Sequence, residues 1–505
     1  MINSTPLHQI VPRTVAITAA LTFSITLLPN ALAAAPPRIV RFTVLQMNDV
    51  YEITPVGGEG GLARVATLRK RLLQNNPNTL TVLDGDLFSP SALGTARVNG
   101  ERLAGKQIVA VMNALGLDHF TFGNHEFDPS EAQFKQRMAE ARFRTVSSNV
   151  KDGQGRSFPN VPEERILTVR GPGGALKVGL FGLTLDSNRK PYVSYADPFK
   201  TAAKEVASLR PKVDVLIAMT HLAFDDDRKL ADDFPQIDAI FGGHEHVHHL
   251  FEKGGVPPIY KADANARTVW IHYFAYDLTK RKLRLRSFLR TIGPDIPEDP
   301  AVKQEVDRWV RIAFDGFRKE GFEPSRRVAT TTVPLDGSEA SVRSQPTRLT
   351  QIVADGMRAE MPEAEMALYN SGSIRIDDVI PPGPISEYDV IRILPFGGKT
   401  VLIEITGSFL QRVLNQGQAN RGNGGYLQTA GAARETGGQE WKIGGQPLDP
   451  ERTYKLAVND FLLTGAEQDL GFFSREAPGV KVIREGRDIR QTTVAEFARV
   501  FKDAR

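Results

Sequence analysis

The chain has 505 residues, of which 41% are hydrophobic and 24% are charged, a balance typical of a soluble globular protein with two or three domains. Its 63 basic and 59 acidic residues leave a net charge of only +4, so the composition gives no reason to expect a nucleic-acid partner. The absence of cysteine excludes disulfide bonds, cysteine-ligated metals, a thiol nucleophile and a lipid-modified N-terminal cysteine.

Residues 1–33 have the pattern of a secretory signal peptide. Arg13 precedes a mostly apolar run from Val15 to Leu28, and "ALA" (Ala31 to Ala33), with a small residue at each end, follows it. The apolar run is short for a membrane span, although an uncleaved membrane anchor is the alternative. We therefore expect cleavage of this segment, no stable membrane anchor afterwards, and a periplasmic or secreted mature chain.

Residues 34–295 alternate short apolar segments with amphipathic ones, which predicts a layered α/β domain. Strands rich in Val, Ile, Leu and Phe are expected at 42–47, 79–84, 178–184, 213–220 and 237–242. Amphipathic helices are expected at 61–75 and 129–142.

Three prolines within residues 293–300 ("GPDIPEDP") mark the end of this domain. In the linker that follows, residues 296–322, apolar residues at helical spacing predict one long helix over 301–320. A second domain, residues 323–505, opens with an amphipathic helical segment and contains several glycine-rich turns.

Eight of the nine histidines lie between His119 and His272, and none lies in the second domain. Structural core histidines have no reason to avoid a whole domain, whereas neutral imidazole is the commonest metal ligand. The distribution therefore favours a metal site in the first domain over a scatter of buried core residues.

Five polar segments lie at the ends of apolar segments: Asp49, Asp84 to Asp86 ("DGD"), Gly123 to Asp128 ("GNHEFD"), His221, and Gly242 to His246 ("GGHEH"). A single aspartate or histidine in such a place is explained by capping or turn formation. Because strand ends in one sheet share an edge, however, five such segments can converge on one site.

The side chains in these segments fit a pair of metal ions. Two carboxylates, one amide and three histidines supply nitrogen and oxygen donors without sulfur, which suits Zn²⁺, Mn²⁺ or iron better than a calcium cage. Six donors are too many for one tetrahedral ion but suit two ions that share a bridging carboxylate. Ion pairs of this kind, about 3.5–4 Å apart, recur in phosphate ester hydrolysis.

In their order along the chain, these segments resemble those of the calcineurin-like metallophosphoesterases, and most closely the 5′-nucleotidase and UDP-sugar hydrolase family. In the second domain, "NSGSIR" (370–375), "ILPFGG" (393–398) and "GGYLQTAG" (424–431) resemble that family's N-x-G-x-I-R, L-P-F-G and aromatic-L-Q segments. The resemblance covers nearly all of the mature chain. It implies an α/β protein with an N-terminal four-layer α/β/β/α sandwich, a long linker helix and a C-terminal α+β nucleotide-binding domain.

The resemblance also implies six metal ligands: Asp49, Asp86, Asn124, His221, His244 and His246. Asp49 and His246 would hold the first ion, Asp86 would bridge both ions, and the remaining three residues would hold the second. Asp84 competes with Asp86, but the family's bridging ligand follows a glycine, which selects Asp86. The identity of the metals (Zn, Mn or Fe) stays open.

Two further residues acquire catalytic roles from the resemblance. His125 would donate a hydrogen bond or a proton to the leaving oxygen without binding metal, and Asp128, three residues along, would orient it. Glu126 would be structural. The histidines that remain are expected at the surface or beside the ligands (His248 and His249) or carry no assignment (His119 and His272).

In the second domain, the substrate's phosphate calls for guanidinium groups and its base for aromatic faces. Arg375 is the first candidate for the phosphate and Arg392 the second, and Asn124 of the first domain is also expected to contact the substrate. Tyr426 matches the family's first aromatic position. The second aromatic follows a glycine-aspartate-glycine turn in the family, from which this chain departs, and Phe472 or Phe473 is expected to replace it. Ordinary core packing is the alternative for each aromatic.

The function implied is that of an exported 5′-nucleotidase, which releases phosphate from nucleoside 5′-monophosphates through attack by a metal-activated hydroxide. Relative motion of the two domains would gate the site. The same site could instead serve a 2′,3′-cyclic nucleotide, a UDP-sugar or other phosphomonoesters. A related hydrolase of sulfur oxidation and a nucleotide-binding or adhesion protein with a decayed centre are more remote alternatives. Oligomeric state is not predicted.

Tyr51 departs from the family's metal motif, which reads D-x-H where this chain has Asp49-Val50-Tyr51. As a phenolate ligand it would favour Fe³⁺ in the first site, because a hard, highly charged ion best lowers the pKa of a phenol from about 10. Alternatively it points away from the metals and leaves a position for water. We expect the second arrangement, because imidazole and phenol differ in reach.

Overall fold

The computed structural model describes residues 38–434 and 440–502. The expected signal peptide, residues 1–33, lies outside the described residues. Among the helices of the described part, none is both long and apolar enough to cross a membrane.

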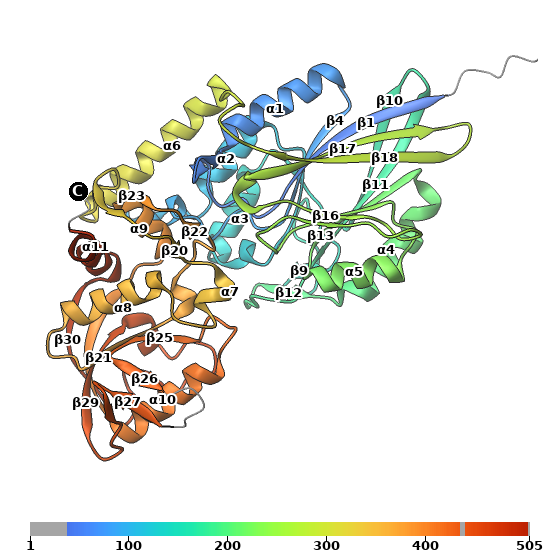
Figure 1. Ribbon diagram of the computed structural model, residues 1–505. Coiled ribbons are helices and arrows are strands. Elements are labelled where there is room, and N and C mark those ends of the chain that lie inside the picture. Colours follow the sequence, from blue (N-terminus) through green and yellow to red (C-terminus); the bar gives the residue numbers. More distant parts are fainter. Residues whose placement is uncertain (1–37, 435–439, 503–505) are drawn as a thin grey trace, which may run out of the picture. The chain divides into compact units, whose positions relative to one another are not determined.

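Two six-stranded sheets form the first domain (Figure 1). The first has the order β18–β17–β1–β4–β7–β8, with bounds β1 Ile39–Met47, β4 Thr79–Asp84, β7 His119–Thr121, β8 Arg144–Thr145, β17 Thr268–Asp277 and β18 Lys282–Thr291. The second has the order β10–β11–β13–β14–β16–β15, with bounds β10 Glu164–Gly171, β11 Gly174–Thr184, β13 Val215–His221, β14 Ala239–Gly242, β15 His249–Phe251 and β16 Ile259–Lys261.

The central strands of each sheet run parallel, so their carboxyl ends share one edge. In the first sheet Met47 of β1 lies opposite Leu83 of β4. In the second sheet Thr220 of β13 lies opposite Gly242 of β14. All five strands expected from the sequence are present, β4 with the expected bounds and the others with ends that differ by a few residues. The polar segments that follow them therefore start from two aligned edges.

Side-chain alternation along β13 shows how the layers form, because successive residues of a strand point to opposite faces. Ile217 and Met219 belong to the buried cluster between the two sheets, together with Phe42 of the first sheet. Leu216 and Ala218 belong to a second cluster, under α4 (Pro198–Leu209) and α5 (Phe224–Asp233). The strand is buried on both faces, which explains its continuous apolar sequence.

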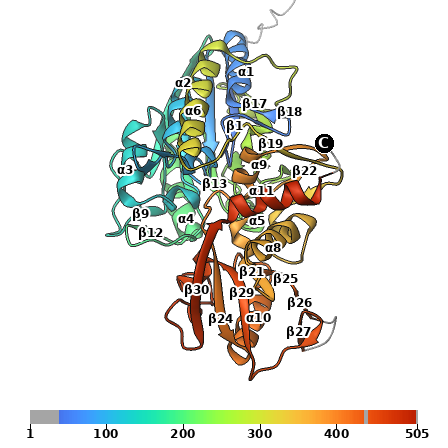
Figure 2. The same ribbon diagram turned by 90° about the vertical axis from the view of Figure 1, so that its left-hand side faces the viewer.

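Helices cover the outer face of the first sheet, and Figure 2 shows α1, α2 and α6 side by side there. The bounds are α1 Leu62–Asn75, α2 Lys106–Leu115, α3 Glu131–Glu140 and α6 Pro300–Lys319. With α4 and α5 on the other side, the layers follow the order α/β/β/α. The four-layer sandwich expected from the sequence is thus confirmed.

The long helix expected over 301–320 is α6, and it also belongs to the first core. Asp299 caps its N-terminus by accepting a hydrogen bond from Val302 N, and Pro300 occupies its first turn. Trp309 and Phe317, on one face, are buried among the side chains of the first domain. The helix therefore connects the domains and contributes to the first core.

A mixed five-stranded sheet organises the second domain in the order β25–β21–β29–β24–β30, with bounds β21 Met366–Asn370, β24 Lys399–Thr406, β25 Leu427–Ala430, β29 Thr453–Asn459 and β30 Val480–Asp488. Helices α8 (Arg348–Glu360) and α11 (Ile489–Val500) cover one face, and α10 (Gly407–Ala419) covers the other. This arrangement matches the expected α+β domain.

Shorter elements connect these layers: α7 Glu339–Val342, α9 Glu387–Ile393, β2 Pro55–Val56, β3 Glu59–Gly60, β5 Arg97–Val98, β6 Glu101–Arg102, β9 Val150–Asp152, β12 Val193–Tyr195, β19 Arg327–Thr331, β20 Leu335–Asp336, β22 Val379–Ile380, β23 Gly383–Ser386, β26 Ala432–Arg434, β27 Trp441–Ile443 and β28 Gln446–Pro447.

Candidate metal centre and active site

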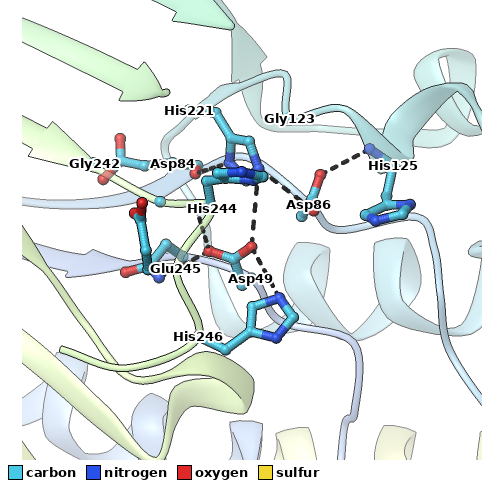
Figure 3. Close-up of polar contacts among 12 residues, drawn as sticks. Asp49, Asp84, Asp86, Gly123, His125, His221, Gly242, His244, Glu245 and His246 are labelled. Carbon is cyan, nitrogen blue, oxygen red and sulfur yellow. Dashed lines mark hydrogen bonds and ion pairs between the residues drawn. The ribbon is translucent and has the colours of Figure 1, made fainter. Parts of the chain in front are cut away.

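Side chains from the loops that follow β1 and β4 meet the last residue of β13 where the two sheet edges face each other. One oxygen of Asp49, one oxygen of Asp86 and a ring nitrogen of His221 all lie within 4.8 Å of one another, and all three residues are buried. His221 Nε2 lies 3.4 Å from Asp86 Oδ2 and 3.9 Å from Asp49 Oδ1. Figure 3 shows Asp49 with His246 on one side and His221 and His244 on the other. The structure brings Asp86, rather than Asp84, into this group.

Glycines allow the loops to approach this closely. A Cβ atom on Gly85 would lie 2.2 Å from His221 Nδ1, and one on Gly123 would lie 2.1 Å from Asp86 Oδ1. Asp49 and Asp86 themselves adopt left-handed backbone, with φ of 51° and 59°. Such conformations cost on the order of 1–3 kcal/mol in residues other than glycine and concentrate at functional sites.

Asp86 is held in place by the "GNHEFD" segment. His125 N donates to Asp86 Oδ1 over 2.8 Å, while the carboxylate of Glu126 accepts hydrogen bonds from the backbone N–H groups of Asp86, Leu87 and Gly123 over 2.6 to 3.0 Å. Glu126 thus joins the two loops through backbone contacts, the structural role the resemblance implied. Its burial, together with the charge of Asp86, raises the pKa of Glu126 to about 7.

His221 is oriented by a carbonyl group. Its Nδ1–H donates to Asp84 O over 2.9 Å, which leaves Nε2 directed at Asp86 and Asp49. Burial opposes protonation of the ring, but the carboxylates of Asp86 and Asp49 outweigh it and raise the pKa of His221 to about 10. The surroundings of this ring therefore favour positive charge, as a cation site does.

His244 and Asn124 lie beside this group. His244 N donates to Asp49 Oδ2 over 2.9 Å, and the His244 ring stands 5.4 Å from the ring of His221. Burial and His221 lower the pKa of His244 to about 4, which keeps its imidazole neutral. Asn124 Oδ1 and His221 Nε2 are buried without a hydrogen-bond partner in the described structure. Orphaned donor atoms and a neutral imidazole are what metal coordination uses.

Tyr51 points into the centre, so the expectation that it points away is wrong. Its hydroxyl lies 2.9 Å from Asp86 Oδ2, 3.1 Å from Asp49 Oδ1 and 3.1 Å from His246 Nε2. Asn265 Oδ1 accepts hydrogen bonds from the backbone N–H groups of Tyr51 and Glu52, each over 3.0 Å, and fixes this turn. Burial and the two carboxylates raise the pKa of Tyr51 well above its ordinary value.

His246 contacts a carboxylate from the second domain. His246 Nδ1 lies 2.5 Å from Asp377 Oδ2, and Asp377 Oδ1 accepts a hydrogen bond from Glu339 N over 2.5 Å. Burial opposes protonation of His246, but Asp377 and Asp49 raise its pKa to about 9. Sequence reasoning missed Asp377, whose only signal was its place two residues after Arg375.

His125 and Asp128 form the expected pair. His125 Nδ1 lies 2.8 Å from Asp128 Oδ2, and Ser89 Oγ and Asn188 Nδ2 donate to the Asp128 carboxylate over 2.8 and 2.6 Å. Burial opposes a charge on the ring, but Asp128 and Asp86 raise the pKa of His125. The pair therefore favours an imidazolium that can donate from Nε2.

The loop that carries His244 and His246 rests on a buried lysine that sequence reasoning missed. Lys261 Nζ donates to Leu222 O over 2.7 Å and to Gly243 O over 2.8 Å. It also forms ion pairs with Asp227, over 2.8 Å, and with Glu245. The sequence around Lys261, a short apolar strand, does not indicate that the amine of this lysine reaches a neighbouring loop.

The remaining histidines lie away from the ligands. His272 is a core residue, with ring nitrogens 2.9 Å from Gln46 Oε1 and 2.8 Å from Ser287 Oγ. His248 is exposed and contacts Asp263, and the ring of His249 stacks on Phe224 at 4.4 Å. Only some of the clustered histidines therefore belong to the site.

Both candidate arginines of the second domain line a cavity that also includes Tyr51 and His246. Arg375 Nη2 lies 3.4 Å from His125 Nε2, and its guanidinium carbon lies 5.7 Å from the centre of the Phe396 ring. Arg392 lies 3.6 Å from Asp389. Arg375 is thus the arginine placed directly beside the catalytic candidate.

The expected aromatic residues do not line the neighbouring cavity. Tyr426 and Phe473 are buried, and Phe472 packs under Arg412, whose guanidinium carbon is 3.8 Å from its ring centre. A cavity of about 640 Å³ is instead lined by Phe396 and Phe461, which are 43% and 42% exposed, with polar neighbours Asn370, Ser373, Asn459, Asp460 and Glu467. Sequence reasoning singled out the "ILPFGG" segment but did not predict that its phenylalanine, Phe396, is exposed and lines a cavity.

Comparison with known proteins identifies the two domains. Residues 42–248 match the family model of the calcineurin-like phosphoesterases, and residues 327–474 match that of the 5′-nucleotidase C-terminal domain. The chain is a calcineurin-like phosphoesterase with a 5′-nucleotidase C-terminal domain. The resemblance inferred from the sequence motifs is therefore confirmed.

Relatives of this phosphoesterase include the 5′-nucleotidase of Homo sapiens, 25% identical over 84% of this chain and 83% of the relative. The trifunctional nucleotide phosphoesterase YfkN of Bacillus subtilis is 26% identical over 91% of this chain and 35% of its own length. The crystal structure of a 5′-nucleotidase precursor from Thermus thermophilus has the same fold, with a TM-score of 0.73, 24% identity and coverage of 91% of this chain and 97% of that one.

The donor set fits the divalent ions that this family uses. Its atoms are nitrogen and oxygen, three of them meet within 4.8 Å, and the site buries unpartnered donor atoms. Together with the family, this arrangement makes the chain a metal-dependent phosphoester hydrolase. A carboxylate–histidine cluster with an adjacent imidazole and arginine can stabilise charge on a phosphoryl group and protonate its leaving oxygen.

Proposed function

We propose that the protein is an exported dinuclear 5′-nucleotidase, with the six ligands divided between two ions as the family resemblance implies. The single observation that carries the nucleotide assignment is the position of Arg375, between His125 on one side and the ring of Phe396 on the other. A phosphate at the metal centre and a base in the aromatic cavity would then be joined by a ribose that passes Arg375.

Each group in the site has a defined task in this reaction. The bound ions, held by Asp49, Asp86, Asn124, His221, His244 and His246, would supply Lewis-acid stabilisation of the phosphoryl oxygens and of the attacking water. Arg375 holds the phosphate with a forked guanidinium. As the phosphorus–oxygen bond to the nucleoside breaks, His125 Nε2 gives its proton to the leaving O5′, while Asp128 keeps the ring oriented.

The base would stack between the two exposed phenylalanines. Phe396 and Phe461 flank one cavity, and stacking of a base on an aromatic face contributes about 1–3 kcal/mol. The side chains of Asn370, Asp460 and Glu467 offer donors and acceptors for the edge of the base or the ribose. We propose this pair in place of Tyr426, Phe472 and Phe473.

A second candidate is the hydrolysis of several nucleotide esters on the same site, including 2′,3′-cyclic nucleotides and UDP-sugars. The similarity to a trifunctional nucleotide phosphoesterase supports it.

We further propose that residues 1–33 are cleaved and that the mature protein is periplasmic or secreted. We also propose that it consists of a first domain (34–295), a linker (296–322) and a second domain (323–505).

Hydrolysis of AMP, ribose 5-phosphate, p-nitrophenyl phosphate, 2′,3′-cyclic AMP and UDP-glucose tests the proposal. AMP is expected to give the highest kcat/KM, and Phe396→Ala and Phe461→Ala are each expected to lower it about tenfold for AMP. The same two substitutions should lower kcat/KM much less for ribose 5-phosphate, because this substrate has no base. Phe288→Ala, at a phenylalanine 56% exposed on β18, is the matched control. Equal rates for AMP and ribose 5-phosphate would contradict base recognition.

A further inference from the structure

The hydroxyl of the tyrosine that replaces the expected histidine lies among the donor atoms proposed for the first ion. The Tyr51 hydroxyl is within 3.1 Å of Asp49 Oδ1, Asp86 Oδ2 and His246 Nε2, the three donors assigned to the first ion in the proposed function. The phenol oxygen, which donates one hydrogen bond and can accept another from the His246 ring, is thus in contact with every donor assigned to the first ion.

The distances place the phenol oxygen among the ligands rather than in the position of the ion. Donors that share an ion at about 2.0–2.2 Å are separated by about 3.0–3.4 Å in octahedral or tetrahedral geometry. Tyr51 Oη lies 3.1 Å from Asp49 Oδ1 and 3.1 Å from His246 Nε2, and those two atoms are 3.6 Å apart. Around an oxygen that stood in the ion's position, donors at this distance would be more than about 4 Å apart.

The surrounding structure holds the phenol in this position. Tyr51 is 7% exposed, and its ring meets the His246 ring edge-on at a centroid distance of 5.5 Å. Asn265 holds this turn with two hydrogen bonds: its side chain accepts from Tyr51 N, and its own N–H donates to Asp49 O over 2.8 Å. Rotation of the ring out of the site would therefore disturb the same turn that positions Asp49.

We propose that Tyr51 is a ligand of the first ion, together with Asp49, Asp86 and His246, and that it makes this position selective for a ferric ion. The proposal rests on the dinuclear site of the proposed function. As the metal–oxygen bond forms, the phenol O–H bond breaks and the proton leaves to solvent. Three anionic oxygen donors and one imidazole nitrogen form a hard donor set, which favours a hard, highly charged cation over the softer zinc ion.

Visible absorption of the iron-loaded protein tests this assignment directly, because a phenolate bound to Fe³⁺ gives a charge-transfer band. The chelated wild-type chain is loaded with ferric citrate and the bound iron is quantified by elemental analysis. We expect a visible band in the wild type and none in Tyr51→Phe, with at least tenfold weaker iron binding in that variant. Tyr51→His should still bind divalent metal but show no band, which separates loss of the ligand from misfolding.

Tyr192→Phe is the matched control, since the Tyr192 hydroxyl bonds only to the carbonyls of Phe127 and Pro129 among the described residues, and it should keep the band. Iron that binds to the wild type without a band, no iron binding at all, or a band that survives in Tyr51→Phe would each overturn the proposal. Phosphate release from AMP is measured in parallel. Hydrolysis without a band overturns only the ligand assignment, and a band without hydrolysis of any phosphate ester overturns only the proposed function.

Discussion

At the scale of single residues, His125 is the group whose contacts most directly define its chemistry. Its Nδ1 is held by Asp128, its Nε2 faces Arg375, and its pKa is raised. Nothing in this arrangement resembles metal coordination, because the one nitrogen that could bind an ion is directed at a guanidinium. The imidazole is instead placed to act on the substrate.

Replacing His125 by alanine should lower kcat for AMP by about 10²–10⁴-fold, the range for loss of a general acid. The loss should be much smaller for p-nitrophenyl phosphate, whose leaving group needs little protonation. Steady-state kinetics with both substrates measures the difference. His248→Ala, at an exposed histidine bonded to Asp263, serves as the control and should leave both rates unchanged. An equal loss for both substrates would contradict the role as acid.

Residue types and spacing were sufficient to predict which strand ends carry the site, but not every side chain in it. Asp49, Asp86 and His221 follow apolar strands, so their convergence follows from the parallel arrangement. The direction of Tyr51 depends on two hydrogen bonds to Asn265, more than 200 residues away along the chain. Contacts of that kind leave no pattern in a single sequence.

At the scale of elements, α6 illustrates how local signals set a boundary. Asp299 accepts from Val302 N, pairs with Lys70 of α1, and is followed by Pro300 at the first helical position. In the sequence these features form a proline-rich segment followed by an amphipathic one, which predicted the domain boundary and the helix. The sequence did not predict that the helix packs on α1 and α2 and so belongs to the first core. Periodicity shows that a helix has an apolar face but not which element that face contacts.

Replacing Asp299 by alanine should reduce the free energy of unfolding by about 1 kcal/mol at pH 7, the typical contribution of an N-cap. Lys70 and the helix N–H groups lower the pKa of Asp299, so its stabilising contribution is present above the unfolded pKa of about 3.9 and is lost as the pH falls through the folded pKa. The difference between wild type and variant should therefore shrink below about pH 4.

Urea unfolding at a series of pH values, followed by circular dichroism, checks this expectation. Asp299→Asn is the matched variant, because asparagine caps a helix equally well but does not titrate. Its stability relative to Asp299→Ala should stay constant with pH. A difference between wild type and Asp299→Ala that is independent of pH would contradict a stabilising contribution from the ionised Asp299 carboxylate.

At the scale of the whole molecule, the metal centre draws on both domains. Asp377 contacts the ring of His246, Arg267 pairs with Asp378 over 2.9 Å, and Tyr388 Oη donates to Glu52 over 2.9 Å. Sequence reasoning predicted that the second domain supplies substrate contacts. Its direct contact with a metal-ligand candidate was missed, because it depends on how the domains meet.

Replacing Asp377 by alanine should weaken metal binding by about 10–100-fold, the usual effect of removing a carboxylate that orients a ligating histidine. Titration of the chelated protein with ferric citrate, with the bound iron quantified by elemental analysis, measures the change. Asp378→Asn, at the neighbouring carboxylate that pairs with Arg267, is the matched control and should keep the wild-type affinity. Unchanged affinity in Asp377→Ala would mean that His246 does not depend on the second domain.

The central claim is that a metal centre built on Asp49, Asp86 and His221 releases phosphate from nucleoside 5′-monophosphates. Its most direct test is phosphate release from AMP before chelation, after chelation, and after metal is restored, with elemental analysis of each sample. We expect bound metal in the active protein, at least a hundredfold loss of activity after chelation, and recovery when ferric and divalent ions are added back together. Full activity in metal-free protein, or no release of phosphate by folded, metal-loaded protein, would contradict the claim.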